Sequence, residues 1–369
     1  MPMKRSKNVG QIKVTEDQCD DMSFALKADN SIDYFPDAFA DVSENIETSG
    51  VIGRHKVVSY FAGCGGMDLG FHGGFEVFGA TVPELDFEIE KAYDFDERCV
   101  ETYKQNISDR IEQVDLSNFD PKNAPRADVL IGGFPCQDFS SCGPKRGLTS
   151  SRGQLYRSLI DYMMHHKPKV VIGENVPHLA RMQKGQVLKT ILEDLSSTGY
   201  KVELWNLYAP DYGIPQNRRR LFFVCVHPDL DGFPEQPAPE FGRDDGGYRS
   251  ISWAIDDLKH TLDESVPNQS QYFLASKAKK GNGQGDEKSK RDHPAYTVRA
   301  NAKSRVQFHY SLERRLTVRE CARLQTFPDD FAFPHSATTN VMQIGNAVPP
   351  ILAHKVAEAV SNFLKASKI

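Results

Sequence analysis

The cysteine in GGFPCQDFS (132–140) stands where a thiol can do chemistry. It follows the apolar run VLIGGF (129–134) and Pro135, which ends the predicted strand and places Cys136 on a turn. This stretch alone leaves three interpretations open: a small buried hydrophobe, a metal ligand or a nucleophile. The other residues that the fold brings to this turn decide between them.

A metal site is the weakest of the three interpretations. The seven cysteines are widely spaced, and none forms a Cys-x-x-Cys pair. Neither structural zinc nor a disulfide framework is therefore expected. We expect no metal ion in the site.

A carboxyl group and arginines are candidates to act with the thiol. Glu174 ends the predicted strand KVVIGEN (169–175), and QNRRRLFF (216–223) places Arg218 and Arg220 at the entrance of another strand. Nearby arginines lower the pKa of a thiol, which favours the thiolate nucleophile. The alternative for the arginines is a solvated strand edge with no part in chemistry.

The glycine-rich stretch FAGCGGMDLGF (61–71) follows the predicted strand KVVSYF (56–61) and opens a helix. Glycines let backbone N–H groups approach a ligand closely, and a helix N-terminus favours polar or anionic groups. Asp68 occupies the third glycine position of G-x-G-x-x-G, so the pattern indicates a nucleotide-like cofactor other than a dinucleotide. A tight turn without a ligand is the alternative.

Two acidic residues follow predicted strands at positions that suit such a cofactor. Asp94 lies at the end of FEIEKAYDF (87–95), where a carboxylate can accept hydrogen bonds from ribose hydroxyls, and Phe95 beside it offers a ring for stacking. Asp115, in QVDL (113–116), can accept from an adenine amino group. Each residue alone has an ordinary structural explanation. Their expected convergence on one sheet edge is what supports a cofactor site there.

The elements that position these residues alternate between strand and helix. Helices are predicted at 96–106, 153–166 and 186–200, and further strands at 127–134, 201–208 and 219–226. Strands separated by helices of about 10–15 residues predict an α/β fold with a Rossmann-like, doubly wound, mostly parallel sheet. The carboxyl ends of its strands lie at one edge, where such folds bind ligands.

The alternation stops after residue 230. Residues 231–310 are rich in proline, glycine and charge, without a sustained helical period, and include the basic stretch 277–291, interpreted as a solvated loop. Regular structure resumes at 314–327, and a helix is predicted over 349–367. A smaller irregular domain therefore interrupts the α/β domain, which the C-terminal helix completes.

Hydropathy argues against a membrane-spanning protein. No apolar run in the 369 residues approaches the ~18–20 needed to cross a bilayer. The N-terminal MPMKRSKNVG lacks the apolar core of a signal peptide, so we expect a cytoplasmic protein. The net charge is −5, but residues 16–50 carry ten acidic side chains against one lysine, which leaves the remainder slightly basic.

Taken in order, these stretches resemble the motifs of bacterial cytosine-C5 DNA methyltransferases of the restriction–modification type. The resemblance covers roughly residues 56–368 and is weakest in 231–290, and the first 55 residues have no counterpart in the minimal family pattern. The motifs are FAGCGGMDLGF, GGFPCQDFS, GENV, QNRRR, RRLTVRECARLQTFPDDF and QIGNAVPP (343–350).

The resemblance implies the fold of S-adenosylmethionine-dependent methyltransferases, with S-adenosylmethionine as the cofactor. Phe61 would touch the adenine ring, Asp94 would hold the ribose, and Asn346 would return from the C-terminal segment to close the pocket. Phe95 would stack on a ring. The residues expected at the cofactor are Phe61, Gly63, Gly65, Asp94, Phe95, Asp115, Leu116, Pro135 and Asn346.

The resemblance also implies the catalytic residues Cys136, Glu174, Arg218 and Arg220. The Cys136 thiolate would attack C6 of a flipped-out cytosine and make C5 nucleophilic, with Glu174 hydrogen-bonded to N3 and the exocyclic amine. Arg220 would contact the base oxygen, and Arg218 the phosphate or the Glu174 side. The loop 138–153 would close over the flipped base.

The implied organisation is an acidic N-terminal extension (1–55), a catalytic and cofactor-binding domain (56–227), a target-recognition domain (228–312) and a return segment with the C-terminal helix (313–369). The expected partner is double-stranded DNA, with a restriction endonuclease as functional counterpart of a monomeric enzyme. The acidic extension is either a solvated tail or lid, or a competitor of DNA for a basic cleft.

Two other functions stay open at this point. One is an RNA C5 methyltransferase on the same core, although the Cys-Phe-Thr tripeptide of the tRNA-methylating eukaryotic relatives is absent from this sequence. The other is a non-catalytic DNA-binding paralogue, against which the complete set of catalytic candidates argues.

Overall fold

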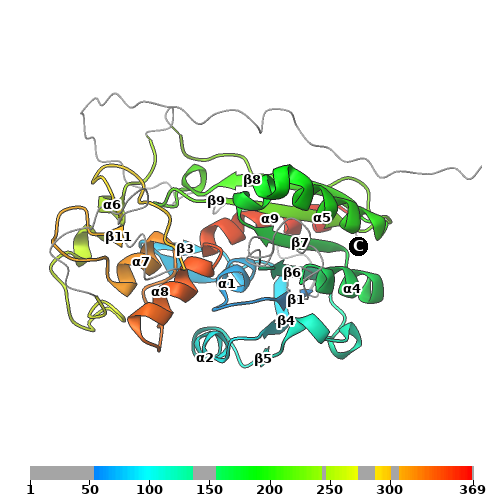
Figure 1. The fold of residues 1–369 in the computed structure, drawn as a ribbon, viewed down its shortest axis with the longest axis horizontal. Helices are drawn as coiled ribbons and strands as arrows, with labels where there is room; N and C mark the ends of the chain where they lie inside the picture. The colour runs from blue at the N-terminus through cyan, green and yellow to red at the C-terminus, as the bar shows by residue number, and fades with distance from the viewer. Residues whose placement is uncertain (1–53, 136–154, 243–246, 273–286, 301–306, 368–369) are drawn as a thin grey trace, which may run out of the picture.

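The computed structural model describes residues 54–135, 155–242, 247–272, 287–300 and 307–367 (Figure 1). Within these residues, seven strands form one sheet in the order β5-β4-β1-β6-β7-β9-β8. Five of them run parallel: β1 (His55–Tyr60), β4 (Phe87–Asp94), β5 (Ile111–Gln113), β6 (Val129–Gly133) and β7 (Val170–Asn175). β9 (Arg219–Val226) is antiparallel to both β7 and the edge strand β8 (Lys201–Tyr208). The predicted α/β, mostly parallel sheet is confirmed.

The central strands are apolar because helices cover both faces of the sheet. β7 reads VVIGEN and is buried throughout, whereas the edge strand β8 has half-buried positions among its buried ones. The boundaries predicted for the last two strands, 201–208 and 219–226, are those of β8 and β9.

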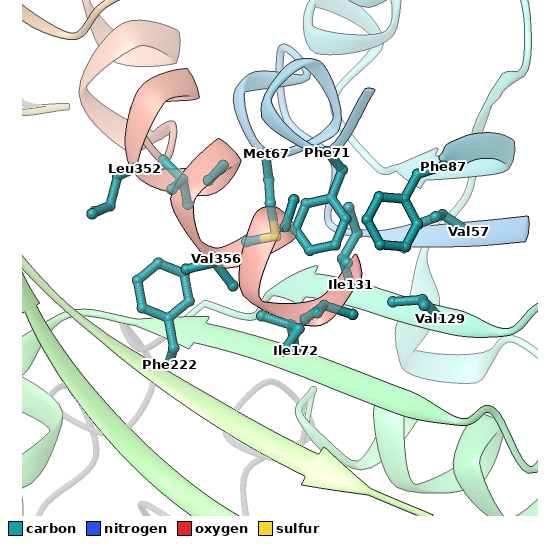
Figure 2. Close-up of a cluster of buried hydrophobic side chains, with 14 of the residues drawn as sticks. Val57, Met67, Phe71, Phe87, Val129, Ile131, Ile172, Phe222, Leu352 and Val356 are labelled. Atoms are coloured by element: carbon teal, nitrogen blue, oxygen red, sulfur yellow. The ribbon is translucent and has the colours of Figure 1, made fainter. Parts of the chain in front are cut away.

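One face of the sheet is covered by α1 (Gly66–His72), α2 (Glu97–Asn106) and α9 (Pro350–Ala366). Figure 2 shows Met67 and Phe71 of α1 and Leu352 and Val356 of α9 pointing into one cluster with strand residues such as Ile131. The C-terminal helix therefore packs beside the first helix. Pro350 stands at the first turn of α9, where its missing N–H costs no hydrogen bond.

The other face is covered by α4 (Arg157–His166) and α5 (Gln186–Ser197). Leu159 and Tyr162 of α4 and Ile191 of α5 pack on strand residues such as Leu130 and Val171. These two layers give the doubly wound arrangement. Five short 3₁₀ segments also lie in the described part: η2 (Leu116–Asn118), η3 (Pro121–Asn123), η4 (Pro177–Gly185), η5 (Ala209–Tyr212) and η6 (Asp256–Leu258).

The strands and α-helices between β9 and α9 gather at one end of the molecule (Figure 1). They are α6 (Ile251–Ile255), β10 (Glu287–Lys288), β11 (Gln307–Phe308), α7 (Val318–Leu324) and α8 (Ala337–Asn346). The helix α7 is shorter than the regular stretch predicted at 314–327, because a Thr317–Glu320 capping box starts it and Thr326, with φ of 64°, follows its end. The domain boundaries at 227/228 and 312/313 stay a prediction.

A hairpin of β2 (Phe75–Val77) and β3 (Ala80–Val82) lies between α1 and β4 and pairs with no strand of the main sheet. The sequence analysis did not predict it. No helix among the described ranges is long and apolar enough to cross a membrane.

Candidate active site

Glu174 and Arg220 meet at the edge of the sheet where the parallel strands end. Gly133 of β6 pairs with Glu174 of β7, and Asn175 pairs with Leu221 of β9. Because β9 runs antiparallel, its first residues lie at the same edge. Arg220 Nε is 2.7 Å from Glu174 Oε1, and both side chains are only 9% exposed.

Burial sets the electrostatics of this pair. It raises the pKa of Glu174, while the charges of Arg220 and Arg218 oppose the increase. A Cβ at Gly133 would lie 3.2 Å from Glu174 Oε2, so a larger residue there would press on the carboxyl group. The site thus holds a shielded carboxyl group that can donate or accept a hydrogen bond.

Asn175 fixes the end of β6 beside this pair. Its Nδ2 donates to the carbonyl of Phe134 at 2.9 Å, and the backbone N–H of Val176 donates to its Oδ1 at 2.8 Å. Pro135 follows Phe134 and is half-buried. Cys136, like the predicted closing loop 138–153, lies outside the described residues. Asn175 follows Glu174 directly in the Glu-Asn-Val motif, and the partner of its side chain on β6 is seen only in the fold.

Arg218 is buried and holds backbone carbonyls. Its guanidinium donates to the carbonyls of Val298 at 3.1 Å, Gly345 at 2.9 Å and Ala347 at 2.7 Å. Two of these carbonyls flank Asn346. Arg218 therefore ties the entrance of β9 to the segment that precedes α9, and its charge opposes the rise that burial causes in the pKa of Glu174.

Gln216 belongs to the same network, a role that the sequence analysis missed. Its Nε2 donates to the carbonyl of Leu324 at 2.8 Å and to Gln325 Oε1 at 2.6 Å, and its Oε1 accepts from the N–H of Val298 at 2.9 Å. Gln325 Nε2 in turn donates to the carbonyl of Ala347 at 2.6 Å. The first position of Gln-x-Arg-x-Arg was the available signal.

The glycine-rich turn between β1 and α1 forms a cradle. Gly65 has φ of 92°, and a Cβ there would lie 2.1 Å from Ile107 Cδ1, so a side chain is excluded. A Cβ at Gly63 would meet no atom within 4 Å, so the backbone there faces open space. Phe61, just before this turn, also has positive φ, 56°, and is half-buried.

Asp94 joins this cradle to the end of β4. Its Oδ2 accepts the N–H of Gly63 at 2.8 Å, and its Oδ1 accepts the N–H of Asp96 at 2.9 Å. Burial raises its pKa, which these two hydrogen bonds oppose. A carboxylate has about four lone-pair positions, more than the backbone donors around Asp94 use, so the side chain can also accept from a ligand. The neighbouring Phe95 is 69% exposed.

Two further predicted residues lie at the same edge, one strand further out. The N–H of Val114 donates to the carbonyl of Asp94 at 2.8 Å, which sets the path of the chain into Asp115 and the buried Leu116. Asp115 accepts the N–H of Ser117 at 2.9 Å and so starts η2.

Asn346 is exposed at the end of α8, in a block that packs on the glycine turn. A Cβ at Gly66 would lie 2.5 Å from the carbonyl of Val348, and Cys64 Sγ is 3.8 Å from the carbonyl of Gln343. Through these contacts and Arg218, the structure gathers the described candidates at one edge of the sheet.

The fold and this edge define an enzyme class: an α/β protein with a cradle for a nucleotide-like cofactor next to a buried carboxyl–guanidinium pair. The model of the C-5 cytosine-specific DNA methylase family matches residues 55–362. The chain belongs to this family and is a DNA cytosine-C5 methyltransferase, as the order of its motifs predicted.

Other methyltransferases align with most of this chain. The Type II methyltransferase M.NgoFVII of Neisseria gonorrhoeae is 32% identical over 339 residues, which covers 83% of this chain and 86% of the relative. The Type II methyltransferase M1.HphI of Haemophilus parahaemolyticus is 34% identical over 338 residues, with 82% and 86% covered. The crystal structure of the S. pombe Dnmt2 methyltransferase, 18% identical, aligns with a TM-score of 0.64 over 86% of this chain and all of its own, which supports the fold.

Proposed function

We propose that the enzyme methylates C5 of a flipped-out cytosine within a specific double-stranded DNA sequence, and that S-adenosylmethionine is the methyl donor. The buried pair of Glu174 on β7 and Arg220 on β9 carries the proposal, because Glu174 lies beside the end of β6, which Pro135 and Cys136 follow in the sequence. The names of the Type II methyltransferases to which the chain is similar support a specific DNA target.

The described residues fit S-adenosylmethionine. The open space at Gly63 admits a ligand against the backbone, Asp94 keeps lone pairs for ribose hydroxyls, and the exposed ring of Phe95 is available for stacking. When bound, the cofactor supplies an electrophilic methyl group. Its expected contacts are Phe61, Gly63, Gly65, Asp94, Phe95, Asp115, Leu116, Pro135 and Asn346.

Cys136 would act as the nucleophile. Its thiolate adds to C6, the S–C6 bond forms, and the electrons of the C5–C6 double bond make C5 nucleophilic. After C5 has been methylated, the C5 proton passes to a base, the double bond re-forms and the thiolate leaves.

Glu174 would stabilise the base as C6 is attacked. Negative charge develops toward N3, and a carboxyl group with a raised pKa can share a proton with that atom while accepting from the exocyclic amine. Arg220 would hold Glu174 and contact the base oxygen. Arg218, with three backbone carbonyls as acceptors, would position the entrance of β9 and the Asn346 segment.

The DNA context follows from the chemistry. A base inside a duplex cannot reach a buried carboxyl group, so the cytosine must be flipped out, at a cost of a few kcal/mol. We assign target recognition to residues 228–312. We also propose that the enzyme acts as a monomer in the cytoplasm and protects DNA from a restriction endonuclease of the same specificity.

The test is methyl transfer from labelled S-adenosylmethionine to unmethylated duplex DNA, with base analysis of the product. Wild type should yield 5-methylcytosine, and Cys136→Ser should yield none. If only RNA is labelled, the substrate is RNA and not DNA. DNA binding without any transfer would favour the non-catalytic paralogue.

A further inference from the structure

The β2–β3 hairpin is longer than the connection from α1 to β4 requires. Such connections usually take about 2–6 residues. Here the chain forms a separate hairpin whose base is closed by hydrogen bonds from Gly74 N–H to the Val82 carbonyl at 2.9 Å and from Leu85 N–H to the His72 carbonyl at 3.0 Å. The tip therefore stands on a fixed base, since Phe75, Val77 and Val82 of the hairpin are buried in the core under α1 and α9.

Phe78 stands at the tip in an unfavourable backbone conformation. Phe78 and Gly79 form the two-residue turn with φ of 53° and 75°, the combination that favours asparagine and glycine. A phenylalanine at such a position costs conformational energy. The compensation lies in its ring, which packs against both the core under α1 and α9 and the core around α6 and α7.

The ring of Phe78 rests on Trp253 of α6. The ring centroids are 4.4 Å apart, and the guanidinium of Arg249 lies 4.2 Å from the Trp253 ring. Arg249 also lies 5.0 Å from the ring of Phe241, which packs on Gly213 so closely that a Cβ there would be 2.7 Å away. One continuous stack thus runs from the hairpin through α6 to the loop between β8 and β9.

The stack connects α6 to the β2–β3 hairpin across the mouth of a hollow. A hollow of about 1040 Å³ lies between the β2–β3 hairpin, α2, α6 and α7. Phe78, Asn106, Trp253 and Phe331 are among the residues that line it. Arg323 ties α6 to α7: its Nη1 donates to the carbonyl of Ala254 in α6 at 3.2 Å and lies 2.6 Å from Asp257 in η6, which follows α6. Without the Phe78 contact, α6 would keep its place on α7 but lose its contact with the β2–β3 hairpin.

We infer that Phe78 is a positioning residue that sets where α6 stands relative to the active-site edge. The inference rests on the proposed function, because α6 lies in the segment 228–312 assigned to DNA recognition. A displaced recognition segment weakens the binding of DNA, while Glu174, Arg220 and the cofactor cradle lie on other elements and are unaffected. Phe78 would therefore strengthen DNA binding equally in the ground state and in the transition state. Its loss raises the KM for DNA and leaves kcat unchanged.

The experiment is steady-state methylation by Phe78→Ala with Phe78→Tyr as the conservative variant. Phe78→Ala should raise the KM for DNA about tenfold, the effect expected from losing an aromatic contact. Its kcat and its affinity for S-adenosylhomocysteine should stay within about twofold of wild type, and Phe78→Tyr should restore the KM. Met164→Ala is the control and should leave the KM unchanged, since Met164 is an exposed apolar residue (58%) of α4, outside the recognition segment.

A double-mutant cycle separates positioning from direct DNA contact. Phe78→Ala combined with Trp253→Ala should be no worse than Trp253→Ala alone, since Trp253→Ala already removes the contact with Phe78 together with the one to Arg249. Effects that multiply would show that Trp253 binds DNA by itself and would overturn the inference.

An unchanged KM in Phe78→Ala, or a joint loss of kcat, cofactor affinity and thermal stability, would overturn it as well. Failure of wild type to methylate DNA would instead refute the proposed function.

Discussion

Glu174 Oε1 and Arg220 Nε, 2.7 Å apart in a buried pocket, come from strands that run in opposite directions. The antiparallel entry of β9 brings the arginine to the edge where β7 ends. Taking either partner away leaves the other as an uncompensated buried charge. The pair is therefore both the electrostatic centre of the proposed site and a point at which the site is sensitive to substitution.

Glu174→Gln should abolish most of the chemical step without weakening DNA binding. The amide keeps the size of the side chain but cannot share a proton with N3, so the single-turnover rate should fall about 100-fold or more. The measurement is rapid-quench methyl transfer with enzyme in excess over DNA. Glu193→Gln, an exposed position on α5, should leave the rate unchanged. A rate within about threefold of wild type in Glu174→Gln would remove Glu174 from the mechanism.

Phe95→Ala should weaken cofactor binding selectively. The ring is 69% exposed, so its loss removes little buried surface and the Tm should change by about 1 °C or less. Loss of a stacking partner should raise the Kd for S-adenosylmethionine about tenfold. Calorimetric titration of Phe95→Ala beside Met164→Ala, another exposed apolar position, checks this. If the two variants bind S-adenosylmethionine with equal affinity, its adenine does not stack on Phe95.

Arg218→Met should destabilise the fold. Methionine fills the space but leaves the carbonyls of Val298, Gly345 and Ala347 without their donor, at about 1–3 kcal/mol for each unpaired buried group. The Tm should fall by roughly 5 °C or more, and the affinity for S-adenosylmethionine should fall with it because two carbonyls flank Asn346. Arg219→Met, an exposed neighbour on β9, is the matched control for differential scanning calorimetry. A wild-type Tm in Arg218→Met would contradict the network.

Asp68 should make stability depend on pH between about 4 and 6. Burial raises its pKa from 3.8 to about 6, although it accepts hydrogen bonds from Ser59 and Tyr103 at 3.0 Å each. In this range the folded protein binds the proton that the unfolded chain has lost, so the Asp68 contribution to the unfolding free energy decreases as pH rises.

The comparison with Asp68→Asn isolates this contribution. The variant should gain roughly 3 kcal/mol relative to wild type between pH 4 and pH 7, in line with a shift of about two pKa units. Urea unfolding of both proteins across this range gives the difference directly. A difference that does not change with pH would show that Asp68 titrates normally.

The sequence predicted those parts of the fold that depend on local pattern. Apolar runs fixed β8 and β9 to the residue, and they placed Asp94 and Glu174 at strand ends. The orientation of β9 depends on which strand it pairs with, which no local run encodes. The hairpin tip at Phe78 was missed because its stability comes from Trp253, far along the chain.

The site shows the same division. Glu174 and the arginines were found because their motif spacing is local. The acceptors of Arg218 lie 80 to 129 residues away, so a role in holding backbone carbonyls was not visible in the sequence. The hydrogen bonds of Asn175 and Gln216 were hidden for the same reason, since the carbonyl of Phe134 is 41 residues from Asn175 and that of Leu324 is 108 residues from Gln216.

The most direct test of the central claim is to trap the bond between Cys136 and the base. In duplex DNA with 5-fluorocytosine at the target, fluorine replaces the proton that must leave C5, so elimination of the thiolate is blocked after methylation. With S-adenosylmethionine present, wild type should form an adduct that survives denaturation and maps by mass spectrometry to the peptide containing Cys136, and Cys136→Ser should form none. An adduct on another residue, or an adduct that persists in Cys136→Ser, would contradict the account.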